Sequence, residues 1–144
     1  MPTINQAGLS LIENFEGCRL TSYQDSGGIW TIGFGHTGNI EPNQTITQGQ
    51  ADAFLEQDLE SAEEAVQNAT EIDLTPNQFA ALVSFQYNTG SIPQSPGMAL
   101  INQRQFEAAW DDHFCLWTRD ANGEVLEGLV RRRAAEKALF FATD

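Results

Sequence analysis

Apolar residues recur at helical spacing near the start of the chain, at positions 4, 8, 11, 12 and 15. The pattern predicts a first helix of about three turns that ends at Glu16, directly before Gly17. Between residues 19 and 46, short runs rich in Thr, Tyr, Ile and Trp are broken by Ser-Gly-Gly at 26–28 and Thr-Gly-Asn at 37–39. These runs predict a small antiparallel sheet.

Helical patterns fill the rest of the chain. Residues 47–50 fit a capping box before a long helix whose apolar face continues to Val66. Thr75 as N-cap and Pro76 at the first helical position open a further helix through Phe85. The apolar residues of that helix cover more than one stripe, which indicates the buried centre of a helical lobe. The remaining predicted elements are a loop with two prolines at 91–97, helices at 98–102 and 106–117, a turn at 119–124 and a last helix at 129–141.

These elements predict an α+β fold with a small antiparallel sheet lobe, a larger helical lobe and a groove between them. A chain of 144 residues suits one domain, which we expect to span residues 1–144. Clefts between lobes are where ligand sites usually lie. The groove is therefore the expected place for a binding or active site.

Composition excludes several classes of protein. The formal net charge of −13 argues against nucleic acid, because phosphate binding needs a basic surface. No apolar run approaches the roughly 20 residues of a membrane span, and the first residues do not resemble a secretory signal. The two cysteines, Cys18 and Cys115, are predicted to be buried reduced thiols, and no cluster of Cys and His has metal-ligand spacing. The acidity is open to two interpretations, a solvated face for solubility or work at high ionic strength.

Two carboxyl groups and a hydroxyl carry the candidate chemistry. Glu16 lies at a helix C-terminus, whose partial negative charge favours the protonated carboxyl. Asp25 leads into the Ser-Gly-Gly turn, where a carboxylate stays hydrated and ionised, and Thr31 lies on the return strand. An acid, a carboxylate and a hydroxyl in this arrangement suit the cleavage of an acetal by water. The alternative for Asp25 is an ordinary turn residue, and the alternative for Thr31 is an ordinary β-branched strand residue.

The spacing of Glu16, Asp25 and Thr31, followed by the residues Gly-Phe-Gly-His at 33–36, resembles the catalytic signature of the bacteriophage-type lysozymes, glycoside hydrolase family 24. Residues 74–85 and 88–90 resemble the central helix of that family, and residues 128–136 resemble its C-terminal helix. The three matches come in family order and span nearly the whole chain. The resemblance implies a lysozyme-like fold.

The resemblance also implies a reaction, the hydrolysis of the β-1,4 bond between N-acetylmuramic acid and N-acetylglucosamine in peptidoglycan. In that reaction Glu16 protonates the leaving oxygen, while Asp25 and Thr31 position the attacking water. A place for water implies inversion at the anomeric carbon. No metal or organic cofactor is expected.

Further roles follow from the resemblance or from residue chemistry. His36 is expected to be structural and paired with Asp58, and one of Arg132 and Arg133 is expected to pair with Glu16. The predicted substrate-binding residues are Gly33, Gly35, Tyr87, Asn88 and Trp117. For Tyr87 and Trp117, a place in the core alone is the alternative.

The expected partner is bacterial peptidoglycan. The N-terminal residues show no membrane anchor, so we expect a monomeric enzyme made in the host cytoplasm. The resemblance implies host lysis, with a pore-former (holin) that releases the enzyme to the wall. Two alternatives remain, a non-catalytic wall-binding or toxin-associated module with the same fold, and a lytic transglycosylase. The intact triad argues against the first, and the equipment for holding water argues against the second.

Overall fold

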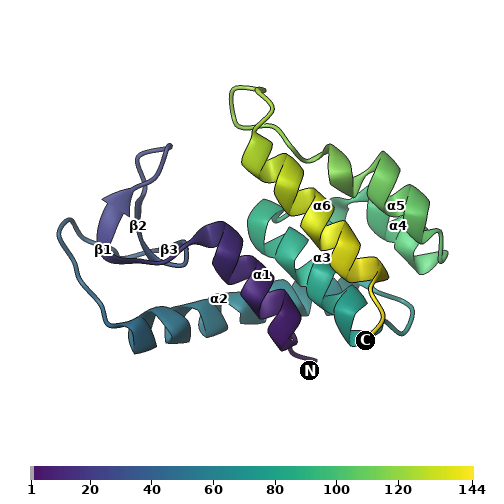
Figure 1. Cartoon of the computed structure of the whole chain (residues 1–144), viewed down its shortest axis with the longest axis horizontal. Coiled ribbons are helices and arrows are strands. Elements are labelled where there is room, and N and C mark those ends of the chain that lie inside the picture. The colour runs from purple at the N-terminus through teal and green to yellow at the C-terminus, as the bar shows by residue number, and fades with distance from the viewer. Residues whose placement is uncertain (1) are drawn as a thin grey trace. The chain divides into compact units, whose positions relative to one another are not determined.

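The computed structural model describes residues 2–144, and the chain forms two compact units. We call Ile12–Ser61 the sheet unit, and Met1–Leu11 together with Ala62–Asp144 the helical unit. The boundaries between the units fall inside two helices, α1 (Gln6–Glu16) and α2 (Gln48–Ala69). Figure 1 labels the helices and strands along the chain.

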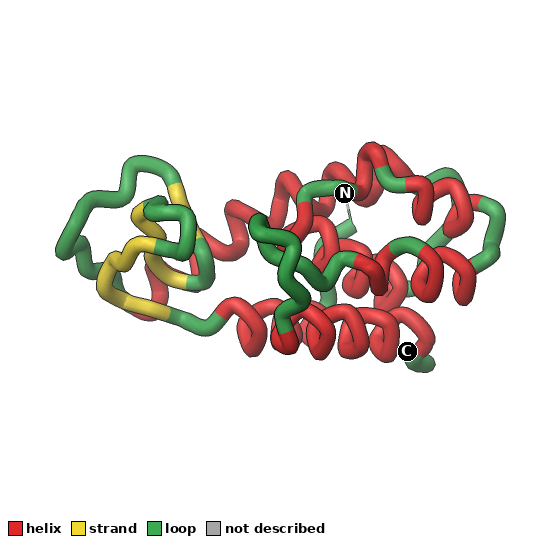
Figure 2. Tube along the Cα trace, turned by 90° about the horizontal axis from the view of Figure 1, so that it is seen from above, coloured by secondary structure: helices red, strands yellow, loops and turns green. Residues whose placement is uncertain are grey.

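The sheet unit contains three short antiparallel strands in the order β1-β2-β3. The strands, yellow in Figure 2, are β1 (Arg19–Gln24), β2 (Trp30–Gly33) and β3 (His36–Thr37). Tyr23 pairs with Thr31, and Ile32 pairs with His36. The predicted small antiparallel sheet is confirmed.

The capping box predicted before α2 is present. The Thr47 hydroxyl accepts a hydrogen bond from the Gln50 amide at 3.1 Å, and the Gln50 side chain accepts one from the Thr47 amide at 2.9 Å. These two bonds satisfy amide groups that a helix start leaves unpaired. The long helix therefore begins where the local sequence predicts.

The helical unit is built on α3 (Pro76–Thr89) and α6 (Glu127–Phe141), which lie side by side in Figure 1. Thr75 and Gln78 form a second capping box at the start of α3, with Pro76 at the first position. Eight residues of α3 are buried, including Leu82, Val83 and Phe85, so its predicted central place is confirmed. The shorter helices α4 (Pro96–Asn102) and α5 (Phe106–Asp112) also belong to this unit.

Two predicted boundaries are wrong. The helix expected at 106–117 ends at Asp112, and a 3₁₀ turn, η2 (Phe114–Leu116), follows after His113 leaves the helical conformation with φ −132° and ψ −69°. This break accompanies the burial of Phe114, whose ring lies so close to Gly97 that a Cβ there would approach it to 2.7 Å. The segment at 91–97 is also more ordered than a loop, because it contains η1 (Ile92–Gln94) and the start of α4 at Pro96.

The prediction of buried thiols is wrong for Cys18. Cys18 is exposed and Cys115 is half-buried, and both are free. Within residues 2–144, no helix is both long enough and apolar enough to cross a membrane.

Candidate active site

Glu16 is the last residue of α1 and is half-buried. Gly17 follows with φ +67°, a conformation that only glycine adopts at little cost, and its amide donates to the Glu13 carbonyl at 3.0 Å. The local sequence therefore ends the helix at Glu16 and places the Glu16 carboxyl group at the negative end of the helix dipole.

Asp25 and Thr31 are joined through one residue, Ile29. The Asp25 side-chain atom Oδ1 accepts hydrogen bonds from the amides of Gly27 at 2.8 Å and Ile29 at 2.9 Å. In return, the Ile29 carbonyl oxygen accepts two bonds, one from the Asp25 amide at 2.9 Å and one from the Thr31 hydroxyl at 2.9 Å. This network fixes Asp25 and Thr31 relative to each other within a few residues of chain.

The network leaves one carboxylate oxygen of Asp25 and the lone pairs of the Thr31 hydroxyl available to a further partner. Both bonds to the Asp25 carboxylate go to Oδ1, so Oδ2 takes no part in the turn. The Thr31 hydroxyl has used its single hydrogen on Ile29, so toward any further partner it can only accept. Asp25 is exposed and Thr31 is 3% exposed. The sequence indicated the turn at Asp25, but it did not indicate the link through Ile29.

His36 and Asp58 lie together in the sheet unit. His36 Nδ1 lies 2.8 Å from Asp58 Oδ2, and the His36 ring stacks on Phe54 with centroids 4.2 Å apart. Phe54 and Asp58 are one turn apart on α2, so they hold the imidazole from its face and from its edge. His36 therefore links β3 to α2 through its contacts with Asp58 and Phe54.

Gly33 and Gly35 both have positive φ, at +66° and +85°. A side chain at Gly33 would lie 3.5 Å from the Cβ of Ala51 and 3.7 Å from Ile46. The space beside Gly33 is thus occupied by α2 and the segment before it. Substrate binding by these two glycines stays a prediction.

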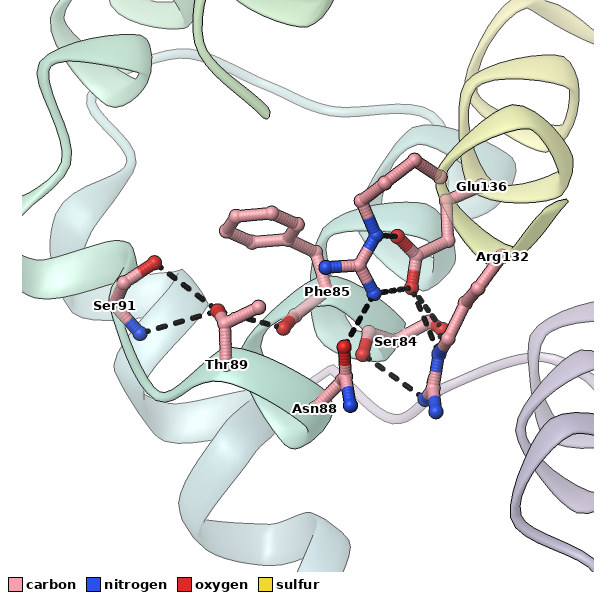
Figure 3. Close-up of polar contacts among 8 residues, drawn as sticks. Ser84, Phe85, Asn88, Thr89, Ser91, Arg132 and Glu136 are labelled. Carbon is pink, nitrogen blue, oxygen red and sulfur yellow. Dashed lines mark hydrogen bonds and ion pairs between the residues drawn. The ribbon is translucent and has the colours of Figure 1, made fainter. Parts of the chain in front are cut away.

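Figure 3 shows a buried ionic cluster in the helical unit, formed by α6 and α3. Arg133 Nε lies 2.8 Å from Glu136 Oε1, and Arg132 Nε lies 3.3 Å from Glu136 Oε2. The Ser84 hydroxyl donates to Glu136 at 2.6 Å. The exposed fractions of the three charged side chains are 4% for Arg132, 1% for Arg133 and 0% for Glu136.

Burial and charge act in opposite directions in this cluster. Burial raises the pKa of Glu136 and lowers the pKa of Arg133, while attraction between the two groups opposes both shifts. Protonation of Glu136 would remove the negative charge that lies within 3.3 Å of both buried guanidinium groups. An ionised Glu136 carboxylate pairs with both arginines and offsets the cost of burying their charges.

The cluster separates the three consecutive arginines of α6. Arg131 is 66% exposed and lies 3.8 Å from Glu127, but Arg132 and Arg133 both contact Glu136. Sequence reasoning missed Glu136, although its spacing of three and four residues from the two arginines is a signal for pairing on a helix. The pairing of Glu16 with Arg132 or Arg133 stays a prediction.

Two of the predicted substrate-binding residues of the helical unit, Asn88 and Trp117, lie close to this cluster. Asn88, on the last turn of α3, accepts a hydrogen bond from Arg133 at 2.6 Å through its Oδ1. Trp117 is 47% exposed, and its ring meets the edge of Phe85 with centroids 6.2 Å apart. Tyr87 is half-buried. The exposure of Trp117 and Asn88 is what sugar contacts require.

The family model for phage lysozyme matches residues 13–136 of this chain. The chain belongs to the phage lysozyme family. It is 38% identical over 142 residues to the endolysin of Acyrthosiphon pisum secondary endosymbiont phage 1, with 95% of this chain and 97% of that protein covered. It is also 39% identical to the endolysin of Bacillus phage PZA, where the match covers 95% of this chain but 54% of the longer relative.

Solved structures agree with this assignment. The muramidase domain of SpmX from Asticaccaulis excentricus superposes with a TM-score of 0.86 at 39% identity, covering 99% of this chain and 100% of that one. The lysozyme-like α+β fold predicted from the sequence is therefore confirmed. The chain is an endolysin-type glycoside hydrolase of the phage lysozyme family.

Proposed function

We propose that this phage lysozyme hydrolyses the β-1,4 bond between N-acetylmuramic acid and N-acetylglucosamine in peptidoglycan, with inversion at the anomeric carbon. Glu16 is the general acid that protonates the leaving oxygen. Asp25 and Thr31 hold the attacking water. The relatives named endolysins and the relative described as a muramidase domain support peptidoglycan as the substrate.

The hydrogen bonds around Ile29 carry the proposal. Because the Thr31 hydroxyl donates to the Ile29 carbonyl, it offers only acceptor capacity to a water molecule. The Asp25 carboxylate is also an acceptor. A water that donates one hydrogen to each keeps its lone pair directed away from both, toward the anomeric carbon. Asp25 then takes the proton as the water attacks, which is the general-base role of an inverting glycosidase.

The reaction balances without a covalent intermediate. The water oxygen bonds to the anomeric carbon, and the glycosidic oxygen leaves with the proton from Glu16. Asp25 receives the proton lost by water. The setting we propose is host lysis, in which a pore-former gives the enzyme access to the wall.

Analysis of the products tests the proposal directly. Purified peptidoglycan treated with the enzyme should yield fragments with a reducing N-acetylmuramic acid end, one water heavier than the anhydro products of a lytic transglycosylase. Proton NMR at early times should show the α anomer first. Anhydro products would contradict hydrolysis, and initial β anomer would contradict inversion.

A pair of variants on α1 tests the general acid. Glu16→Gln is nearly isosteric but has no acidic proton, so lysis should fall by roughly 10²–10⁴-fold. Glu13→Gln makes the same substitution about one turn earlier on the same helix and should leave lysis near the wild-type rate. A folded Glu16→Gln protein that lyses walls normally would exclude Glu16 as the acid. Wild-type protein that lyses no walls would favour the non-catalytic module.

A further inference from the structure

Asn88 joins the exposed end of α3 to a buried cation. Its side-chain oxygen Oδ1 accepts a hydrogen bond from Arg133 Nη2 at 2.6 Å, and Arg133 is 1% exposed. In Figure 3 the carbonyl oxygen of Asn88 points toward this contact, and its amide nitrogen points away. Asn88 itself is exposed.

The chemistry of arginine fixes this orientation. A guanidinium group has only donors, so the group that faces it must be an acceptor. Turning the Asn88 amide around would place an NH₂ group against a cation and would remove an acceptor from a buried charged donor. A hydrogen bond to a charged group favours the amide orientation that makes it over the flipped orientation by roughly 10- to 100-fold. Asn88 therefore presents its NH₂ group outward, and it presents a donor.

Arg133 is in turn held from two other sides. Its Nε lies 2.8 Å from Glu136 Oε1, and its guanidinium carbon lies 4.9 Å above the centre of the Phe85 ring. The ring face attracts the cation and the carboxylate pairs with it. The buried cluster thus fixes Arg133, and Arg133 fixes the direction of the Asn88 amide.

We infer that Asn88 is a specificity-determining residue whose NH₂ group binds the carbonyl oxygen of an N-acetyl group on the glycan, with Arg133 and Glu136 as its positioning residues. This inference depends on the proposed action on peptidoglycan. A sugar hydroxyl both donates and accepts, so it would be served by either orientation of the amide. The acetamido oxygen only accepts, so it is the sugar group for which a fixed donor discriminates.

The substitution Asn88→Asp separates the two ends of the side chain. A carboxylate of the same size still accepts from Arg133, with greater strength, so the melting temperature should stay the same or rise. Its outward atom is now an oxygen, which repels the acetamido oxygen. We expect kcat/KM on N-acetylated peptidoglycan to fall at least tenfold. Asn122→Asp adds the same charge on an exposed turn of the helical unit and is the matched control.

Chemical de-N-acetylation of the wall provides the second arm. It replaces the acetamido group, whose oxygen accepts, with an ammonium group, which donates. The rate of the wild-type enzyme should therefore fall. The Asn88→Asp variant should equal or exceed wild type on this substrate. Asn122→Asp should follow wild type on both walls. Because it carries the same added charge, it controls for the general attraction between an acidic enzyme and an ammonium-bearing wall.

Two results would overturn the inference. One is an Asn88→Asp variant that matches Asn122→Asp on N-acetylated wall. The other is a loss of the same size on both walls, because the bound group would then not be the acetamido oxygen. Wild-type enzyme that cleaves neither wall would instead refute the proposed function, so the two failures are distinguishable.

Discussion

Replacement of Glu136 by Gln should destabilise the helical unit far more than the loss of an ordinary ion pair. Gln is nearly isosteric with Glu, and its side-chain oxygen can still accept the hydrogen bond from Ser84. The change therefore creates no cavity. What it removes is the negative charge beside two guanidinium groups that are 4% and 1% exposed.

The magnitude follows from the burial of Arg133. Without the carboxylate, Arg133 keeps the neutral partners Asn88 and Phe85, at 2.6 Å and 4.9 Å. Removing one partner of a buried ion pair costs about 3–5 kcal/mol, because the other charge remains out of water. A protein of this size has a total unfolding free energy of about 5–15 kcal/mol, so the variant loses a large part of its stability. At roughly 3 °C per kcal/mol, the melting temperature should fall by about 10–15 °C.

Urea unfolding at pH 7, followed by circular dichroism, measures this loss. Glu127→Gln is the matched control, because it removes the same charge from the same helix where the partner Arg131 is 3.8 Å away and 66% exposed. An exposed pair contributes about 0.2–1 kcal/mol, so this control should shift the unfolding free energy by less than about 1 kcal/mol. If Glu136→Gln loses no more than Glu127→Gln, the carboxylate is not what makes the burial of the two arginines possible, and our account of the cluster is wrong.

Three further predictions concern other groups. Thr31→Val should lower wall hydrolysis by roughly 100-fold, whereas Thr31→Ser should retain most of it, because only the acceptor oxygen is needed; equal rates for the two variants would contradict a role for the hydroxyl. Burial raises the pKa of the Cys115 thiol, so in a Cys18→Ser variant the rate of iodoacetamide alkylation should reach half its maximum at a higher pH than for free cysteine; a midpoint at or below that of free cysteine would refute this. With a net charge of −13, lysis of an anionic wall should rise with salt between 0.01 and 0.15 M, as the Debye length falls from about 30 to about 8 Å, while cleavage of a neutral chitin-type oligomer should change little. A steady fall in lysis over this range would instead indicate a local basic surface.

The sequence alone determined the features that depend on neighbouring residues. The capping box at Thr47 and the N-cap at Thr75 were predicted because a capping hydrogen bond joins residues three positions apart. The end of α1 at Glu16 was predicted because Gly17 adopts the positive φ that follows many helices. The turn after Asp25 is equally local, since its hydrogen bonds span two to four residues. Such features require no knowledge of distant parts of the chain.

The tertiary structure decided which polar groups are buried and where helices are interrupted. Three consecutive arginines are equivalent in the sequence, but only Arg132 and Arg133 are buried, because α3 supplies Ser84 and Asn88 from 48 and 45 residues away. The helix expected to reach residue 117 ends at Asp112 because the Phe114 ring packs against Gly97 and Phe85. Helix periodicity reports which residues share one face, and it carries no information on what covers that face. Packing between elements far apart in the sequence therefore determined the buried cluster, and with it the orientation of Asn88.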